Sequence, residues 1–516
     1  MKQPNDDKSA ASATFATIRS RALCGLEALP VTVECMASSG LPGTTLVGLP
    51  QAAVRESRDR VRSALKSSGF FYPNKHVTIN LAPGDLTKQG THLDLPIALS
   101  ILKASGQLQC QGLNEIEFAG ELGLFGEVRP ITGAVAKAAA AMAEARQAVL
   151  PAANRRELSI LGKPSIHLVD DLRGLVNQLE SIPATGRLPV TELTPPTGHK
   201  STQTAAPIFG QYLAKLALQI AAAGGHHLLM LGPPGSGKTL LAGNLQYLLP
   251  PLSSEQAVEV AATWGVAGIT RNHFQRPPIR TPHHSASTVA MAGGGTPPQP
   301  GEIALAHRGV LFLDELPHFK PATLDLLREP LEQGCIHISR VAHKVTYPCK
   351  FQLVAAMNPC PAGQHCSAEH CRCAPAQVQR YQSRVSGPLL DRIDLQVFVP
   401  ALNSDELSGD SMVDTTDWPA LREQVAAARS YQLQRQGCLN AELPWSRLQA
   451  FTHRVNRESV RTAIGRYHLS ARSLHKLWRI ARTLADLRGE QEEVLQEDFL
   501  KALSFRSIDW KGLTAA

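Results

Sequence analysis

Short apolar runs alternate with polar segments over the first third of the chain. Residues 77–81, 116–118 and 166–169 are apolar or β-branched and predict strands, whereas the Ala-rich stretch 133–148 predicts a helix. Mixed strands and helices within residues 15–180 are typical of an α/β or α+β domain.

Apolar strand-like runs alternate with helical patterns from residue 207 to 400, as a wound parallel sheet requires. Beyond residue 401 no run predicts a strand convincingly, and 421–436 and 474–487 carry apolar residues at helical spacing. The fold class is therefore α/β with a helical C-terminal region. We expect a disordered N-terminus at 1–14, an α/β domain at 15–180, a Pro- and Thr-rich linker at 181–206, an α/β core at 207–400 and a helical bundle at 401–516.

The composition is that of a globular protein: 43% of the 516 residues are hydrophobic and 19% are charged. No uncharged apolar stretch reaches the roughly 18 residues that cross a membrane, and the polar first residues lack a signal-peptide core. We therefore expect a cytoplasmic protein without a membrane partner. Its ten cysteines should be reduced thiols rather than a disulfide scaffold.

Positive charge is concentrated near the end of the chain. The net charge is +8, and residues 421–516 carry 16 Lys and Arg against 10 Asp and Glu. This excess permits a polyanionic partner. A solvated basic helix surface explains it equally well.

A Gly-rich octapeptide follows the apolar run 228–231, where a strand should turn into a helix. Glycines let successive backbone N–H groups face a phosphate at a helix N-terminus. Lys238 then reaches the β- and γ-phosphates, and the hydroxyl of Thr239 binds Mg²⁺. The residues expected to cradle ATP are Gly232, Pro233, Pro234, Gly235, Ser236, Gly237, Lys238 and Thr239.

Two further strand ends supply polar groups. The apolar run 310–313 ends in Asp314 and Glu315, and the run 351–357 ends in Asn358. Ligands bind at the carboxyl ends of the strands in open α/β sheets. We expect Asp314 to hold Mg²⁺, Glu315 to act as general base on the attacking water, and Asn358 to position that water.

This set, together with Leu-Leu-Asp-Arg-Ile-Asp at 389–394, resembles an AAA+ ATPase. Thr-Pro-His-His-Ser at 281–285, three glycines at 293–295 and Pro-Gly-Glu-Ile-Ala-Leu-Ala-His-Arg-Gly at 300–309 resemble the magnesium-chelatase-like branch. Within that branch the chain is more similar to the ComM/YifB subfamily of competence-associated hexameric helicases than to the chelatase subunit.

The resemblance implies further roles. Arg392 would be an arginine finger that reaches a neighbouring subunit's ATP, with Arg384 as a competing candidate, and Arg472 would be the sensor-2 arginine of the helical lid. Each could instead form an ordinary surface salt bridge. Gly210 and Gln211 match the adenine-side motif, although the residues before them depart from it.

Relatives in this branch carry two insertions that face a central pore. The first would cover residues 283–307, whose glycines and prolines suit an exposed loop. The second would be a hairpin that pairs 335–339 with 345–347. Its tip carries Arg340, His343 and Lys344, which could track a DNA backbone in a ring of six subunits.

Four cysteines follow Asn358 closely: Cys360, Cys366, Cys371 and Cys373. Their thiolates could hold a structural Zn²⁺, for which His365 and His370 are alternative ligands. Four unligated reduced thiols are the competing interpretation, because the spacing is not that of a standard zinc finger.

Residues 88–99 and 120–131 resemble the Lon-protease-like fold. Lon-type chemistry requires a serine nucleophile and a lysine base. His92 stands at the serine's position and Val135 at the lysine's, and helical spacing predicts that Lys137 points elsewhere. We therefore expect a catalytically degenerate scaffold domain.

The sequence predicts an ATP-hydrolysing ring motor, hexameric with ATP and DNA, that unwinds or branch-migrates DNA. Resemblance to ComM implies a role in homologous recombination during natural transformation, with recombination proteins as candidate partners. The alternatives are a magnesium-chelatase-type ATPase subunit, a Lon-like ATP-dependent protease or chaperone, and a nucleotide-dependent switch. The complete hydrolysis set disfavours the switch.

Overall fold

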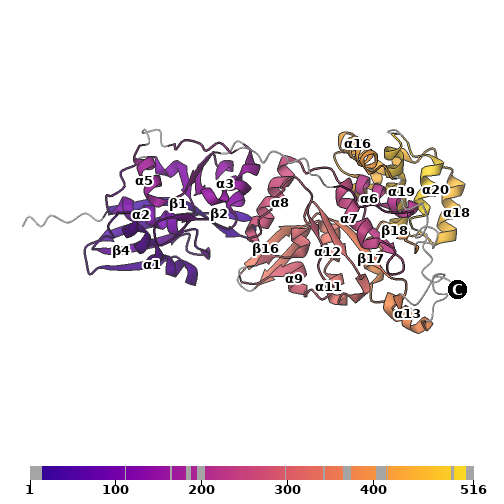
Figure 1. Cartoon of the computed structure of the whole chain (residues 1–516), viewed down its shortest axis with the longest axis horizontal. Helices are drawn as coiled ribbons and strands as arrows, with labels where there is room; N and C mark the ends of the chain where they lie inside the picture. Colours follow the sequence, from indigo (N-terminus) through magenta and orange to yellow (C-terminus); the bar gives the residue numbers. More distant parts are fainter. Residues whose placement is uncertain are drawn as a thin grey trace, which may run out of the picture. The chain divides into compact units, whose positions relative to one another are not determined.

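The protein is described here by a computed structural model (Figure 1). Its internal contacts divide the chain into two compact units. The first comprises residues 1–199, 254–274 and 296–299, and the second comprises 200–253, 275–295 and 300–516. The structure describes residues 14–110, 112–162, 165–181, 187–193, 204–296, 298–340, 343–363, 373–401, 414, 416–489 and 493–506.

The first unit is built on a seven-stranded mixed sheet with the strand order β3-β4-β2-β1-β5-β8-β9. Its strands are β1 (Thr14–Cys24), β2 (Glu27–Ser38), β3 (Gly43–Val47), β4 (His76–Ala82), β5 (Ile116–Phe118), β8 (Gln147–Pro151) and β9 (Ile166–Val169). Its longer helices are α1 (Ala52–Ser67), α2 (Asp94–Ala104), α3 (Ala134–Ala143), α5 (Leu172–Glu180) and α8 (Ser254–Val266). The strands predicted at 77–81, 116–118 and 166–169 are confirmed.

The helix predicted over 133–148 is too long. Helix α3 ends at Ala143, Ala145 adopts a left-handed φ of 57°, and the chain then enters β8. All five β8 residues are buried, because β8 lies between β5 and β9. A strand buried on both faces has a continuous apolar run, which periodicity alone does not separate from a helix.

Helix α8 lies in the first unit, although it falls within the stretch 207–400 that the sequence pattern assigns to one core. Ala261 of α8 and the nearby Phe274 share an apolar cluster with Ala134 and Ala138 of α3. The backbone N–H of Gly133 also donates to the carbonyl of Gly265. The first unit is therefore completed by residues that follow the P-loop in sequence.

The second unit contains a five-stranded, fully parallel sheet in the order β11-β14-β17-β10-β18. Its strands are β10 (Leu228–Leu231), β11 (Ile279–Arg280), β14 (Val310–Leu313), β17 (Gln352–Met357) and β18 (Leu395–Phe398). Its helices include α6 (Tyr212–Gly224), α7 (Lys238–Leu248), α9 (Thr288–Ala292), α10 (Glu302–Leu305), α11 (Pro321–Asp325), α12 (Arg328–Gln333), α13 (Pro375–Gln382) and α14 (Gly387–Leu390). Every residue of β10, β14 and β17 is buried, as the apolar runs predict.

The two expected insertions differ in their local structure. The hairpin is confirmed: β15 (Cys335–Arg340) pairs antiparallel with β16 (His343–Pro348). The stretch 283–307 is not simply an exposed loop, because it forms α9 and α10 and buries Met291, Ile303 and His307. Apolar side chains spaced among its glycines explain this burial.

The C-terminal residues form helices α16 (Trp418–Gln436), α17 (Trp445–Leu448), α18 (Arg457–Tyr467), α19 (Ala471–Leu487) and α20 (Gln496–Leu503), as predicted. One apolar core joins this helical region to the sheet and includes Leu228, Val354, Trp478 and Phe499. Among the described helices, none is long and apolar enough to span a membrane.

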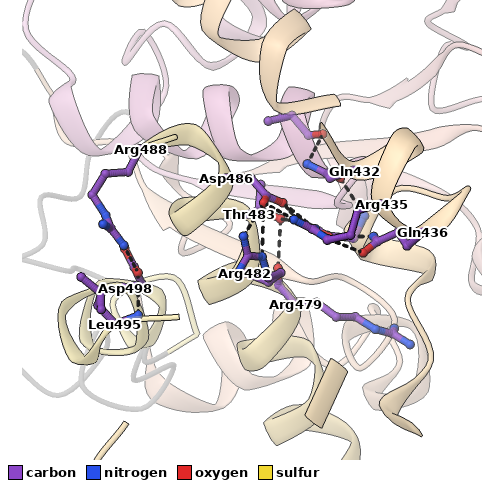
Figure 2. A network of polar contacts seen from close by, with 12 residues as sticks. Gln432, Arg435, Gln436, Arg479, Arg482, Thr483, Asp486, Arg488, Leu495 and Asp498 are labelled. Atoms are coloured by element: carbon purple, nitrogen blue, oxygen red, sulfur yellow. Dashed lines mark hydrogen bonds and ion pairs between the residues drawn. The ribbon is translucent and has the colours of Figure 1, made fainter. Parts of the chain in front are cut away.

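A buried polar network holds the C-terminal helices together (Figure 2). The carboxylate of Asp486 on α19 accepts hydrogen bonds from Arg435 of α16, from Arg482 one turn earlier, and from Asn440. The side chains of Arg482 and Asp486 are both 0% exposed, and the guanidinium groups of Arg435 and Arg482 both pack on the ring of Phe451. A charge buried at this depth fixes the position of α19 because it requires its partners.

Candidate nucleotide site

The Gly-rich octapeptide joins β10 to α7 at one end of the parallel sheet. Gly235 and Gly237 have φ values of 78° and 90°, a region that only glycine adopts without strain. Gly232 must also lack a side chain, since a Cβ there would lie 2.1 Å from the carbonyl oxygen of Val399. The backbone at this turn is therefore shaped as an anion-binding loop that opens into a helix N-terminus.

Lys238 begins α7 and folds back over the loop. Its Nζ donates to the carbonyl oxygens of Gly232 at 2.8 Å and Pro233 at 2.7 Å, and lies 3.3 Å from Oδ1 of Asn358. Burial lowers the pKa of Lys238, and the charge of Asp314 opposes that shift. An ammonium with only neutral acceptors should exchange them for a phosphate, because charge-assisted hydrogen bonds are stronger.

The two predicted magnesium ligands meet directly. The hydroxyl of Thr239 donates to Oδ2 of Asp314 at 2.8 Å, and Oδ1 of Asp314 accepts from the backbone N–H of Glu315 at 2.8 Å. A hydroxyl and a carboxylate in contact beside a phosphate loop are oxygen donors of the type that Mg²⁺ prefers. The residues present therefore fit Mg²⁺ and ATP.

Glu315 lies on the rim of a cavity of about 550 Å³. Its backbone has a left-handed φ of 52°, and its Oε2 lies 3.3 Å from Nδ1 of His284. The ring of His284 lies 4.1 Å from that of His283 and 5.8 Å from that of His318, measured between centroids. The cavity is lined by Thr239, Gly243, Ile279, Thr281, Pro282, His283, His284, Phe312, Asp314 and Glu315.

The contact of His284 with Glu315 was not foreseen from the sequence. In the sequence, the motif at 281–285 indicates only a family signature. The motif lies directly after β11, which is the neighbour of β14 in the sheet, and this position is the signal that indicates a contact with Glu315. A side chain there must lie beside the carboxylates that follow β14, because parallel strands end at the same edge.

Asn358 lies where its strand predicts. It follows β17, which pairs with both β10 and β14, and its amide oxygen faces the Lys238 ammonium. The structure thus brings Lys238, Thr239, Asp314 and Asn358 together around the carboxyl ends of three adjacent strands.

Gly210 and Gln211 precede α6 with left-handed φ values of 56° and 54°. The side-chain amide of Gln211 donates to the carbonyl of Pro400 at 2.7 Å. Val399, the residue before Pro400, donates its N–H to the carbonyl of Leu231, and its own carbonyl lies against Gly232. The two predicted adenine-side residues are therefore fastened to the P-loop through the end of the neighbouring strand.

Arg392 and Arg472 meet at one carboxylate. Oε1 of Glu332 accepts from Nη2 of Arg392 at 2.6 Å and from Nη2 of Arg472 at 2.8 Å. The side chain of Arg392 is 10% exposed, whereas Arg472 is half exposed and Arg384 is exposed. Sequence reasoning did not identify Glu332, whose spacing from either arginine carries no recognisable signal.

The predicted DNA contacts lie at the hairpin tip, where Arg340 pairs with His343 and Lys344 pairs with Ser339. The Lys344 side chain is exposed. The side chains of Arg340 and His343 lie outside the described part of the structure.

Two of the four predicted zinc ligands are described. Cys360 is buried, and Cys373 packs on the same small cluster beside Val378. Cys366 and Cys371 lie outside the described residues. Within the ranges that the structure describes, no three His, Cys, Asp or Glu side chains gather as metal ligands.

In the first unit, His92, Val135 and Lys137 are all buried. Burial, together with the charge of Lys137, keeps the pKa of His92 well below its ordinary value. Burial also lowers the pKa of Lys137 to about 7, opposed by Glu157, and its Nζ donates to the carbonyl of Thr132. Helix α3 is buried over a wide arc, so spacing alone does not exclude Lys137 from the interior.

Comparison with known families matches three consecutive parts of the chain. The family described as magnesium chelatase, subunit ChlI, matches residues 205–407, a further ChlI family matches 33–154, and the ChlI C-terminal family matches 417–506.

Individual relatives extend the similarity over nearly the whole chain. The competence protein ComM of Haemophilus influenzae is 42% identical over 502 residues, covering 96% of this chain and 98% of that protein. The uncharacterised protein YifB of Salmonella typhimurium is 42% identical over 505 residues with the same coverage. The magnesium-chelatase 67 kDa subunit of Heliobacterium mobile is 28% identical over 194 residues, 32% of this chain and 29% of that protein.

Proposed function

The chain belongs to the magnesium-chelatase-like AAA+ family that includes ComM and YifB, and on that premise we propose that it is an ATP-hydrolysing ring motor that unwinds or branch-migrates DNA. The family supports ATPase activity with ATP and Mg²⁺, and the name of ComM connects a full-length relative to competence. Action on DNA, assembly as a hexamer, and service to recombination during natural transformation are our proposals.

The observation that carries the ATPase part is the convergence of four polar side chains on the P-loop. Thr239 contacts Asp314, and Lys238 contacts Asn358, across three adjacent strands. Mg²⁺, held by Thr239 and Asp314, would neutralise charge on the phosphate oxygens.

The hydrolytic step needs a base and an orienting group beside the γ-phosphate. Lys238 leaves its loop carbonyls to bind phosphate, and Glu315 accepts the proton of the attacking water at a carboxylate oxygen. Asn358 supplies an uncharged amide that orients that water without repelling the phosphate. In the structure Nδ1 of His284 lies 3.3 Å from Oε2 of Glu315, so His284 would hold the base at the cavity.

DNA movement would require copies of the chain arranged around a pore. The exposed Lys344, repeated at six hairpin tips, offers cations that follow a phosphate backbone without reading its sequence. Such binding should weaken steeply with salt because each phosphate contact releases counterions. An affinity that is insensitive to salt would contradict contacts by Lys344.

A labelled four-way DNA junction tests the motor directly. Wild-type protein with ATP and Mg²⁺ should convert the junction to separated arms. The Glu315→Gln variant should bind ATP but leave the junction unconverted. Glu329→Gln, which removes a carboxylate away from the ATP cavity, is the matched control and should retain ATP hydrolysis. Hydrolysis of ATP by the wild type without any strand movement on junctions or forks would remove the motor from the proposal.

A magnesium-chelatase subunit is the second candidate, favoured by the chelatase families matched along the chain. This function would require ATP-dependent Mg²⁺ insertion into a porphyrin when partner subunits are added. A Lon-like protease is a weaker alternative, because His92 stands where that chemistry requires a serine. ATP-dependent cleavage of an unfolded protein substrate would revive it.

A structural zinc at Cys360, Cys366, Cys371 and Cys373 is a separate proposal. The packing of Cys360 and Cys373 in one cluster brings the two ends of the cysteine segment together. Metal analysis of the purified chain should find about one zinc per polypeptide, and less than about half would reject the site.

A further inference from the structure

A single carboxylate oxygen holds both arginines that the family resemblance assigns to ATP. Glu332 lies in the last turn of α12, and its Oε1 accepts from Arg392 at 2.6 Å and from Arg472 at 2.8 Å. Both guanidinium groups lower the pKa of Glu332, so the carboxylate is ionised at neutral pH. The triad joins α12, the segment after α14 and the first turn of α19.

Within its own chain, the guanidinium of Arg392 is committed. Nη2 binds Glu332, Nη1 donates to the carbonyl of Pro388 at 2.7 Å, and the side chain is only 10% exposed. Ser386 adds a second tether, because its hydroxyl donates to Asp325 of α11. In this conformation the two terminal nitrogens of Arg392 are engaged within the chain, and its Nε is buried without a hydrogen-bond partner among the described residues.

Helix α12 also contacts the hairpin. One turn before Glu332, the carboxylate of Glu329 lies 3.7 Å from Nε2 of His337 in β15. Gly334, with a left-handed φ of 68°, joins α12 directly to β15, and its carbonyl accepts from the N–H of Cys349. Residues three apart share a helix face, so a displacement of the hairpin is transmitted to Glu332.

We propose that Glu332 is a latch that holds Arg392 in its own subunit and releases it when a neighbouring subunit presents ATP. The inference rests on the proposed function of an ATP-hydrolysing ring, and it takes Arg392 as the arginine that acts in trans, as the family resemblance implies. Release is favourable because a triphosphate offers a guanidinium more negative charge and a bidentate geometry. A hairpin that moves on DNA would assist release through α12.

The latch is tested by nucleotide-induced assembly of the full chain. Sedimentation with Mg²⁺ and a non-hydrolysable ATP analogue, without DNA, gives the protein concentration at half-assembly. A half-exposed ion pair shifts such an equilibrium by about twofold to fivefold. Glu332→Gln should lower the half-assembly concentration by that factor, and Glu332→Asp, which keeps the charge, should stay near wild type.

Two controls separate a latch from a general change of charge. Glu423→Gln removes an exposed carboxylate of α16 without touching Arg392 or the hairpin, and it should assemble as wild type does. In an Arg392→Ala background, Glu332→Gln should give no further gain, because the group it releases is gone. Thermal melting of each variant establishes that it is folded.

Three results overturn the latch: an unchanged half-assembly concentration in Glu332→Gln, weaker assembly of that variant, or a gain that persists without Arg392. Weaker assembly would instead make Glu332 a group that orients the arginines for their work. Failure of the proposed function is recognised separately, because it appears as absent strand movement on junctions and forks.

Discussion

Neutralising the buried carboxylate of Asp486 should destabilise the C-terminal helices more than substituting an exposed residue of the same helices. Its carboxylate is 0% exposed and accepts from Arg435 at 2.7 and 3.1 Å, from Arg482 at 2.6 and 3.2 Å, and from Asn440 at 2.7 Å (Figure 2). Asp486→Asn keeps the shape but leaves two guanidinium groups around a neutral amide, whose NH₂ faces their N–H groups. Removing one partner from a buried ion pair costs about 3–5 kcal/mol.

Urea unfolding followed by tryptophan fluorescence reports this loss. Three of the five tryptophans, Trp418, Trp445 and Trp478, lie in the C-terminal helices. With a urea dependence of about 2 kcal/mol per molar, the midpoint of their transition should fall by roughly 2 M. Because α19 also carries Arg472, the ATPase rate should fall at urea concentrations that the wild type tolerates.

Glu423→Gln is the matched control, since Glu423 is an exposed carboxylate on α16 of the same helical region. Substitutions of exposed residues such as this one change the free energy of unfolding by less than about 0.5 kcal/mol. A midpoint shift below about 0.5 M for Asp486→Asn, comparable to that of the control, would refute the reasoning that the buried charge holds α19 in place.

Three further outcomes follow from the site. Lys238→Ala should weaken ATP binding by about 10- to 100-fold, because one charge-assisted contact to phosphate is lost; titration with a fluorescent ATP analogue measures it. Asn358→Ala should lower kcat by about 100-fold with little change in KM, since it misplaces the water but leaves ATP bound; equal losses in both constants would contradict that role. Burial acts to raise the pKa of Asp414, but hydrogen bonds from the backbone N–H of Ile208 and from Thr416 and Trp418, together with the contact with Lys215, hold that pKa well below its ordinary value. The ionised Asp414 carboxylate therefore stabilises the fold fully above its unfolded-state pKa near 3.9, and this stabilisation is lost as pH falls through its lower folded-state pKa. Below about pH 4 the urea midpoint should decline more steeply in the wild type than in Asp414→Asn.

Local patterns predicted most of the elements, and the overlong helix has an identifiable physical cause. The hairpin of β15 and β16 and the strand ends at Asp314 and Asn358 follow from runs that are short and bounded by turn signals. The overlong helix at 133–148 arises where burial surrounds an element, so that periodicity no longer distinguishes an inner face from an outer one.

The sequence by itself determined the chemistry at the P-loop. Gly232, Lys238 and Thr239 are contiguous, and Asp314 and Asn358 end strands of a parallel sheet, so one topological rule brings them to the same edge. Backbone geometry and strand polarity are short-range properties that a linear pattern encodes. The nucleotide site could therefore be placed from sequence before its contacts were known.

Only the tertiary structure decided which partner each isolated charged group meets. Glu332 binds both Arg392 and Arg472, and Arg472 lies 140 residues after Glu332 in the sequence. His284, which follows a different strand, contacts Glu315. Helix α8 leaves the core in which its sequence position would place it. Such pairings depend on how separately folded elements pack, and since any exposed carboxylate can bind any arginine, residue type and spacing do not specify the choice.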